Sequence, residues 1–232
     1  EDILDAANEA LNSGRNHIKL YFMIGLPTET EDDLFAIVDL VKKITALRQA
    51  GGKKKPFRIS VSASTFVPKP HTPFQWEPQL SMEEIRSRQD LLRKHLRKLR
   101  GVEFSWHNPE MSYLEGVFSR GDRRLAPVLK RAFLEGSRLD AWNDSFDFPL
   151  WKKVFEDEGT DPDYFTLYNP ALDDPLPWDH ISTGVSKDFL IGEWRKALAA
   201  ELTEDCREEG CVGCGLSNCP VQEGEAKCTT TF

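Results

Sequence analysis

Hydrophobic positions in the first half of the chain alternate between helical spacing and the spacing of β-strands. Apolar residues at helical spacing predict a helix over residues 2–12, which would end at Gly14. Residues 17–25 then include a continuous apolar run, Leu20–Ile24. Because such runs are typical of parallel strands covered on both faces, we expect this first strand to be buried on both sides.

A second helix and a second strand follow. Thr30 and Asp33 form a capping pair ahead of an aliphatic stripe at helical spacing, and this pattern predicts a helix that closes at Gly51. Residues 58–67 alternate between apolar and mainly serine positions, which predicts a strand with one polar face.

A third helix and a third strand complete the pattern. Ser81 and Glu84 form a capping box for a helix that reaches Leu99, and residues 101–106 alternate again as a strand does. Strands that alternate with helices predict right-handed crossovers onto a parallel sheet. The fold class expected is therefore α/β.

The alternation is compatible with two arrangements of this sheet: an open doubly wound sheet and a sector of a barrel. Ser60, Ser62 and Ser64 share one face of the second strand. Helices that cover the outside of a barrel pack on aliphatic residues, so a small polar face suits a lumen that binds a ligand. An exposed edge strand is the alternative. We expect the C-terminal strands of a partial (β/α)6 TIM-like barrel.

The alternation of predicted strands and helices ends after residue 108. Short helices are predicted around residues 110–118 and 124–139, followed by an aromatic stretch rich in proline and aspartate over residues 142–178. A last helix runs from Lys187 to about residue 202. The expected organisation is a barrel portion (1–108), an accessory and mainly helical subdomain (109–200) and a cysteine-rich, metal-binding tail (201–232).

All five cysteines fall after residue 205. A tight cluster of this kind points to a metal site rather than to a disulfide framework. Cys206, Cys211, Cys214 and Cys219 offer four thiolates among glycine-rich turns. Four thiolates suit zinc or an auxiliary iron–sulfur cluster, and the spacing favours zinc slightly. Cys228 is a spare in this interpretation, and an acidic, solvated tail without metal is the alternative.

Composition places the chain among ordinary globular proteins, with 40% hydrophobic and 29% charged residues. No apolar run approaches the roughly 20 residues that a membrane helix needs, so we expect a soluble cytoplasmic protein with no membrane partner. The net charge of −8 argues against bulk coating of nucleic acid but allows local basic faces. Because the sequence begins with Glu1 rather than methionine, we interpret it as a fragment of a longer polypeptide.

Basic residues gather on the helix over residues 82–99 and again over residues 120–131. Such runs are usually solvated faces, and the alternative is a surface for RNA or a phosphate-bearing substrate. The segment SRGDRR, residues 119–124, opens a helix. Its amides and arginines would hold a phosphate, or Asp122 would serve as a helix cap paired with an arginine.

The exits of the first two strands carry the clearest ligand-binding signals, because ligands bind at such strand ends. Gly25 allows the backbone to approach a ligand closely, Pro27 fixes the loop, and Glu29 lies where a helix begins. The second exit, residues 64–76, is a rigid loop with three prolines, suited to form a wall against a flat ring.

These two exits also carry a family resemblance. Residues 21–33, YFMIGLPTETEDD, resemble the fifth-strand segment of radical S-adenosylmethionine (SAM) enzymes, and residues 64–76, STFVPKPHTPFQW, resemble the sixth-strand segment. The later segments SRGDRR, FLEGSRLDAWNDSF and LPWDHI and the terminal cysteines resemble an uncharacterised subgroup of B12-binding radical SAM proteins.

The resemblance implies a [4Fe-4S] cluster that cleaves SAM reductively and a 5′-deoxyadenosyl radical that abstracts hydrogen from a substrate. It also implies a partial six-stranded barrel and, from the subgroup, cobalamin. The residues that would lie against the adenine and ribose of SAM are Gly25, Leu26, Pro27, Glu29, Phe66, Val67 and Pro68.

The sequence departs from the family at the cluster itself. The family holds its cluster with CxxxCxxC, and this spacing does not occur here. We therefore expect the cluster ligands in the upstream part of the same polypeptide, so that this C-terminal fragment alone is inactive. Two rival functions are an RNA-binding accessory module with a structural zinc knuckle and a barrel hydrolase, for which no convincing nucleophile–base set is found.

Overall fold

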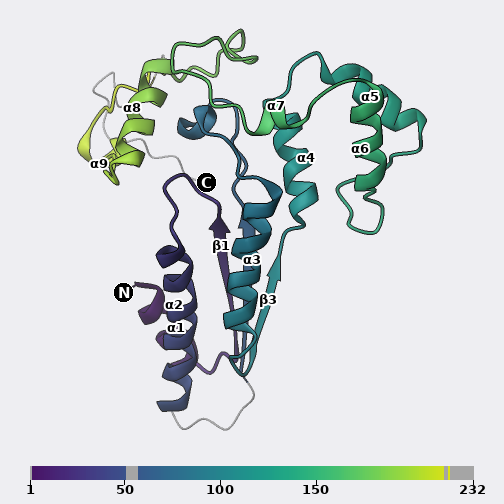
Figure 1. Cartoon of the computed structure of the whole chain (residues 1–232). Helices are drawn as coiled ribbons and strands as arrows, with labels where there is room; N and C mark the ends of the chain where they lie inside the picture. Colours follow the sequence, from purple (N-terminus) through teal and green to yellow (C-terminus); the bar gives the residue numbers. More distant parts are fainter. Residues whose placement is uncertain (1, 51–56, 217–218, 220–232) are drawn as a thin grey trace.

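The computed structural model describes residues 2–50, 57–216 and 219 (Figure 1). Its sheet contains three parallel strands, β1 (His17–Ile24), β2 (Arg58–Thr65) and β3 (Val102–Trp106), in the order β1-β2-β3. The expected α/β alternation and parallel pairing are confirmed.

The expected barrel is wrong. Within the described residues the sheet is open, and neither β1 nor β3 pairs with a further strand at its outer edge. Closure into a barrel requires the two outer strands of a tilted, staggered sheet to meet. The serine alternation in β2 correctly indicated one polar face, but a polar face is equally compatible with an open sheet. The partial (β/α)6 barrel is therefore replaced by an open three-stranded α/β sheet.

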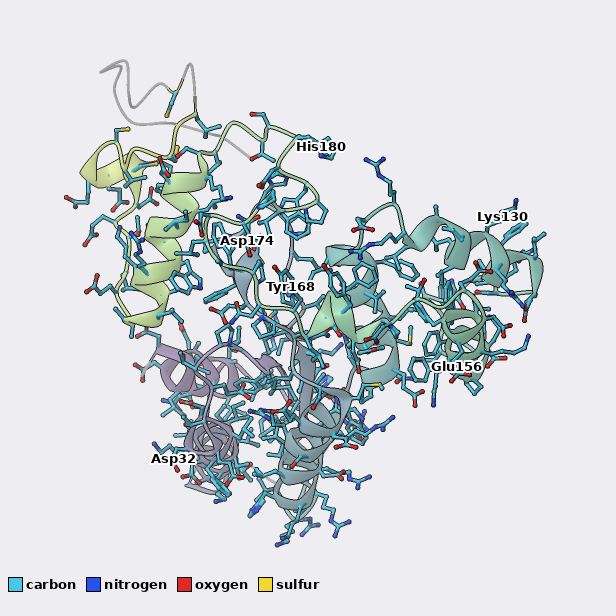
Figure 2. The ribbon with its side chains drawn as sticks, turned by 45° about the horizontal axis from the view of Figure 1, so that its top comes forward. Asp32, Lys130, Glu156, Tyr168, Asp174 and His180 are labelled. Carbon is cyan, nitrogen blue, oxygen red and sulfur yellow. The ribbon has the colours of Figure 1, made fainter. Side chains whose placement is uncertain are left out.

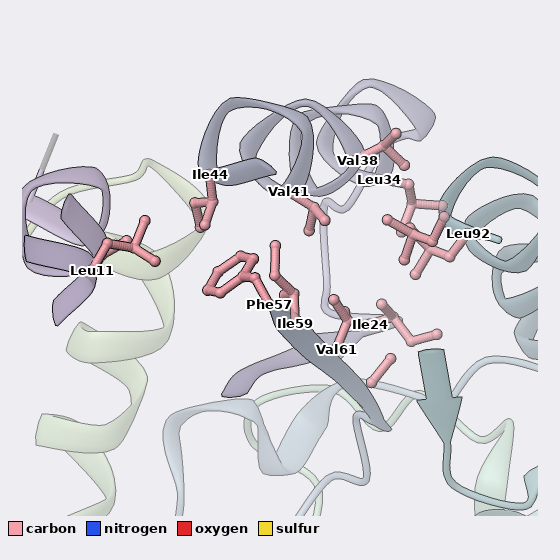
Figure 3. Packing of buried hydrophobic residues seen from close by; sticks show 13 residues of the cluster. Leu11, Ile24, Leu34, Val38, Val41, Ile44, Phe57, Ile59, Val61 and Leu92 are labelled. Carbon is pink, nitrogen blue, oxygen red and sulfur yellow. The ribbon is translucent and has the colours of Figure 1, made fainter. Parts of the chain in front are cut away.

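Helices pack on one face of this sheet. They are α1 (Asp2–Asn12), α2 (Glu31–Ala50) and α3 (Met82–Leu96). The aliphatic side chains of α2 and Leu92 of α3 meet Ile59 and Val61 of β2 in a fully buried core (Figure 3). The capping box predicted at Ser81 and Glu84 is present and begins α3.

The opposite face of the sheet is not covered by any described helix. Tyr21 is 75% exposed and Met23 is 48% exposed. The sequence-based expectation that β1 is buried on both faces is therefore wrong, because no layer formed by the described residues packs on the second face of the sheet. Ser60, Ser62 and Ser64 of β2 lie on this same face and are half-buried.

Four helices form a second hydrophobic cluster beyond the carboxyl ends of the strands. They are α4 (Pro109–Arg120), α5 (Leu125–Leu134), α6 (Phe148–Asp157) and α7 (Asp163–Thr166). The helix predicted over residues 124–139 stops at Leu134, because the chain reverses at Gly136 with a φ of +106°. Figure 1 shows α5 and α6 side by side in an arm that projects from the sheet.

A third cluster joins the short 3-10 helix η1 (Pro73–Trp76) to α8 (Lys187–Leu198). The indole of Trp178 donates to Gln75 Oε1 at 2.7 Å, and the indole of Trp194 donates to Glu77 Oε1 at 2.6 Å. The Trp194 bond ties α8 to the segment that follows η1, and the Trp178 bond ties the segment before α8 to η1. A last short helix, α9 (Cys206–Glu209), begins the cysteine-rich tail. No helix in the described part of the chain is long and apolar enough to span a bilayer.

Candidate functional site

The exits of β1 and β2 lie side by side at the carboxyl edge of the sheet. Ile24 pairs with Thr65, and the amide of Phe66 donates to the carbonyl of Ile24 at 2.8 Å. The structure therefore brings together the two segments that the sequence singled out, residues 25–29 and 66–68. Parallel pairing in register explains this, because two strands paired to their last residues must release their loops at the same edge.

A carboxylate holds the first exit in a closed turn. The amide of Gly25 donates to both carboxylate oxygens of Glu29, at 2.9 and 3.0 Å, and Gly25 has a φ of +82°. Arg88 Nε of α3 donates to Glu29 Oε1 at 2.9 Å. The Glu29 side chain is only 7% exposed. Glu29 therefore shapes the turn, and its position makes it a positioning group rather than an exposed ligand contact.

Other residues of the two exits differ in exposure. Leu26 is 37% exposed, and Pro27 and Val67 are half-buried. Phe66 is buried and meets Phe74 edge to face at 5.7 Å between ring centroids, and Pro68 is also buried. The side chains of Phe66 and Pro68 therefore support the loop, while Leu26 and Val67 present apolar surface.

The tail cysteines form one organised turn. The amide of Gly213 donates to Cys211 Sγ at 3.4 Å, and the carbonyl of Cys214 accepts from the amide of Ser186 at 2.8 Å. An amide directed at the first sulfur of a Cys-x-x-Cys turn is a contact typical of the shell around metal-binding cysteines. Gly215 then continues with a φ of +95° against Ser186.

The full set of four cysteines is not gathered at one point. In the part of the chain that the structure describes, no group of three or more histidine, cysteine, aspartate or glutamate side chains has the arrangement of a metal site. Cys206 begins α9, Cys211 is exposed, and Cys214 and Cys219 are half-buried. The contacts found in the described tail therefore order the Cys211–Cys214 turn, while Cys228 lies outside the described residues.

Within residues 119–124, Asp122 pairs with an arginine as expected, but it is not the cap of α5, whose N-cap residue is Arg124 and has no side-chain cap bond. Asp122 accepts from the amide of Arg124 at 2.9 Å and pairs with its guanidinium at 2.7 Å. This contact lowers the pKa of Asp122. The amides of Leu125 and Ala126 donate to carbonyls of the same turn. The amides that a phosphate would need at this helix start are therefore already occupied.

A neighbouring feature was missed by sequence reasoning. The turn between α4 and α5, the helix α7 and the segment over residues 168–180 surround a cavity of about 930 Å³. Arg120 lines it and is only 6% exposed. This burial could not be predicted from the sequence, because the groups that enclose Arg120 come from distant parts of the chain.

Comparisons with known proteins identify no activity for these features. No protein-family model matches the chain, and no solved structure matches it. An uncharacterized protein of Methanocaldococcus jannaschii is 29% identical over 160 residues, which are 68% of this chain and 33% of that protein. The chain therefore spans about a third of the length of the curated relative that it matches.

Proposed function

We propose that this chain is the C-terminal part of a radical SAM enzyme, in which the exits of β1 and β2 contact SAM. The adjacent placement of residues 25–29 and 66–68 carries this proposal, because one small ligand can touch both segments only if they share an edge. Residues 109–200 would then face the substrate. The ligands of the [4Fe-4S] cluster would lie in the upstream part of the same polypeptide, with cobalamin as a further cofactor of that part.

The residues present fit the adenosine part of SAM. Leu26 and Val67 offer partly exposed apolar surface for the adenine ring. Glu29 would act as a positioning residue that holds the turn, with Arg88 behind it. When bound beside the cluster, SAM would supply the radical chemistry, and this chain would bind and orient its nucleoside.

Titration of the isotope-labelled chain with SAM, followed by amide NMR, tests this proposal. We expect shifts concentrated at residues 25–29 and 66–68. Glu29→Gln weakens the hydrogen bonds that the Gly25 amide donates to residue 29. It should reduce the affinity for SAM by about fivefold, on the scale of one charge-assisted hydrogen bond. Glu83→Gln changes an exposed carboxylate on α3 and serves as the control. Absence of shifts at both exits would contradict the proposal.

The proposal also predicts inactivity of this chain by itself. After anaerobic reconstitution with iron and sulfide, the chain should release no 5′-deoxyadenosine from SAM in the presence of a strong reductant, because it lacks CxxxCxxC. Chromatographic detection of that product measures the outcome. Catalytic turnover would show that the cluster ligands lie within this chain and would contradict the assignment of the radical-generating centre to the upstream polypeptide.

The second metal site belongs to the same proposal. We infer that Cys206, Cys211, Cys214 and Cys219 hold zinc or an auxiliary iron–sulfur cluster, with the Cys211–Cys214 turn as the part already organised for binding. The hydrogen bond from Ser186 to the carbonyl of Cys214 joins this turn to the start of α8. A metal here would fasten the tail to the helix that lies above the strand exits.

A further inference from the structure

The C-terminal residue of α4, Arg120, is a buried cation that makes no direct ion pair among the described residues. The Arg120 guanidinium donates to the carbonyl of Glu77 and, at 2.5 Å, to the carbonyl of Tyr168. Among the described residues it forms no ion pair. The carboxylate of Glu77 accepts from the indole of Trp194 at 2.6 Å. Arg120 is thus held by two carbonyl dipoles. Burial lowers its pKa, and the charge of the Glu77 carboxylate, which makes no direct ion pair with it, opposes this effect in part.

A buried charge of this kind is unfavourable. Removing a guanidinium from water costs several kcal/mol unless an opposite charge compensates for it. Carbonyl dipoles satisfy hydrogen-bond donors but do not neutralise the charge. An anion bound beside Arg120 would therefore find a cation that is already desolvated and fixed in orientation, a combination that favours binding.

The cavity beside Arg120 is large enough for such an anion together with an organic group. Its volume of about 930 Å³ lies within the range of small-molecule sites. The residues that line it include Arg120, Arg123, Tyr164, Tyr168, Trp178 and His180. Figure 2 shows Tyr168, Asp174 and His180 along the segment that leads from α7 towards α8.

Of the three arginines that line the cavity, Arg120 and Arg123 form no direct ion pair with any described residue. Arg124 is paired with Asp122, and Asp174 accepts from the Tyr168 hydroxyl at 3.1 Å and from the amide of Ala171 at 2.9 Å. Arg123 is exposed, and no ion pair is found for it among the described residues. The lining therefore carries three arginines, Arg120, Arg123 and Arg124, against the two carboxylates of Asp122 and Asp174. This excess of positive charge suits a phosphate more than a neutral group.

The wall of the cavity is aromatic. The rings of Tyr164 and Tyr168 are stacked at 5.6 Å with an interplanar angle of 5°, and they are 48% and 45% exposed. Arg124 lies over the Tyr164 ring at 4.5 Å and holds it in place. A fixed aromatic surface that remains half exposed offers a stacking platform for a planar ring.

We propose that this cavity binds a nucleoside phosphate, with the phosphate on Arg120 and Arg123 and the base against Tyr164 and Tyr168. The proposal rests on the buried cation and its cavity and does not depend on SAM binding at the strand exits. A free nucleotide and a phosphorylated nucleotide of RNA share this chemistry, and the experiment distinguishes them.

Calorimetric titration of the chain with AMP, GMP, CMP and UMP, each in turn, tests the proposal. At least one of them should bind at least tenfold more tightly than its nucleoside and than inorganic phosphate. Arg123→Ala and Tyr164→Ala should each weaken that binding about tenfold, on the scale of one charged contact or one stacked base. The matched control is Arg100→Ala, an exposed arginine beside the opposite end of the strands.

A second measurement uses Arg120 itself. The tightest nucleotide should raise the melting temperature of the unmodified chain and should not raise that of Arg120→Gln. If Arg120→Gln does not fold, Arg123→Ala and Tyr164→Ala still decide the outcome. Titration with a 5′-phosphorylated RNA oligonucleotide identifies the source: tighter binding than the mononucleotide that depends on Arg123 assigns the site to RNA, and weaker binding assigns it to free nucleotide.

Three results would overturn the proposal. The first is no binding of any mononucleotide or of the RNA at millimolar concentration. The second is equal affinity for nucleoside and nucleotide, because the arginines would then have no role. The third is an equal loss of affinity in Arg100→Ala, because binding would then reflect overall charge. None of these results bears on SAM contacts at residues 25–29 and 66–68, so the two proposals fail separately.

Discussion

Replacing Cys211 and Cys214 together with serine should reduce the metal content of the chain from about one zinc ion or cluster to none. These two residues form the organised turn of the tail, with the Gly213 amide directed at Cys211 Sγ. A serine hydroxyl is a poor ligand for zinc or iron at neutral pH, so the remaining two cysteines cannot complete a four-coordinate site. Elemental and acid-labile sulfide analysis of anaerobically purified chain measures the change.

The metal found decides the role of the tail. Iron with sulfide, lost in the double variant, would assign an auxiliary cluster, whereas zinc alone would assign a structural site. Cys228→Ser is the matched control and should keep its metal, since Cys228 is not among the four proposed ligands. Unmodified chain that contains neither metal would refute the proposed site and leave the tail as a solvated segment.

Replacing Gly101 with alanine should lower the free energy of unfolding by about 3 kcal/mol. Gly101 has a φ of +80°, and a Cβ atom there would lie 2.7 Å from the carbonyl oxygen of Phe57. Left-handed backbone costs a non-glycine residue roughly 1–2 kcal/mol, and displacement of the Phe57 carbonyl adds to that cost. The carbonyl of Gly101 also accepts from the amide of Ile59 at 2.8 Å, so the displacement reaches β2.

Gly14→Ala provides the comparison that isolates the clash. Gly14 has a φ of +90°, but a Cβ atom there would meet nothing within 4 Å. Backbone strain alone should therefore lower the free energy of unfolding of this variant, by roughly 1 kcal/mol. Denaturant unfolding of both variants by circular dichroism measures the difference. Equal destabilisation at Gly14 and Gly101 would show that the contact with Phe57 has no energetic effect.

The regular part of the fold was predictable because local signals determined it. The capping box at Ser81 and the serine alternation of β2 predicted the element types that the structure has. The error at β1 has a physical cause: hydrophobicity at Tyr21 and Met23 does not determine whether another layer covers them. The prediction of a barrel was wrong for a similar reason. Local sequence patterns do not determine whether the outer strands of a sheet meet, and in the described residues they do not.

The helical region was predicted less well. The helix α6 was missed although Asp147 caps it, with its carboxylate accepting from the amide of Leu150 at 3.1 Å, and Pro149 lies in its first turn. These signals are local, but the aromatic stretch over residues 142–178 was assigned to a mainly helical subdomain without a helix at this position. The burial of Arg120 was different in kind, because the carbonyls of Glu77 and Tyr168 that enclose it lie far away in the chain.

The strand order β1-β2-β3 has a consequence for how the chain acquires its structure. β2 pairs with β1, and β3 pairs with β2. Each of these pairings can therefore form as soon as the later of its two strands has been synthesised. His17 pairs with Arg58 and Ile59 pairs with Val102, so each pairing closes a shorter loop, at a lower cost in entropy, than a pairing of β1 with β3 would. We therefore expect the β-sheet to form stepwise as the chain leaves the ribosome, before α8 and the cysteine-rich tail emerge.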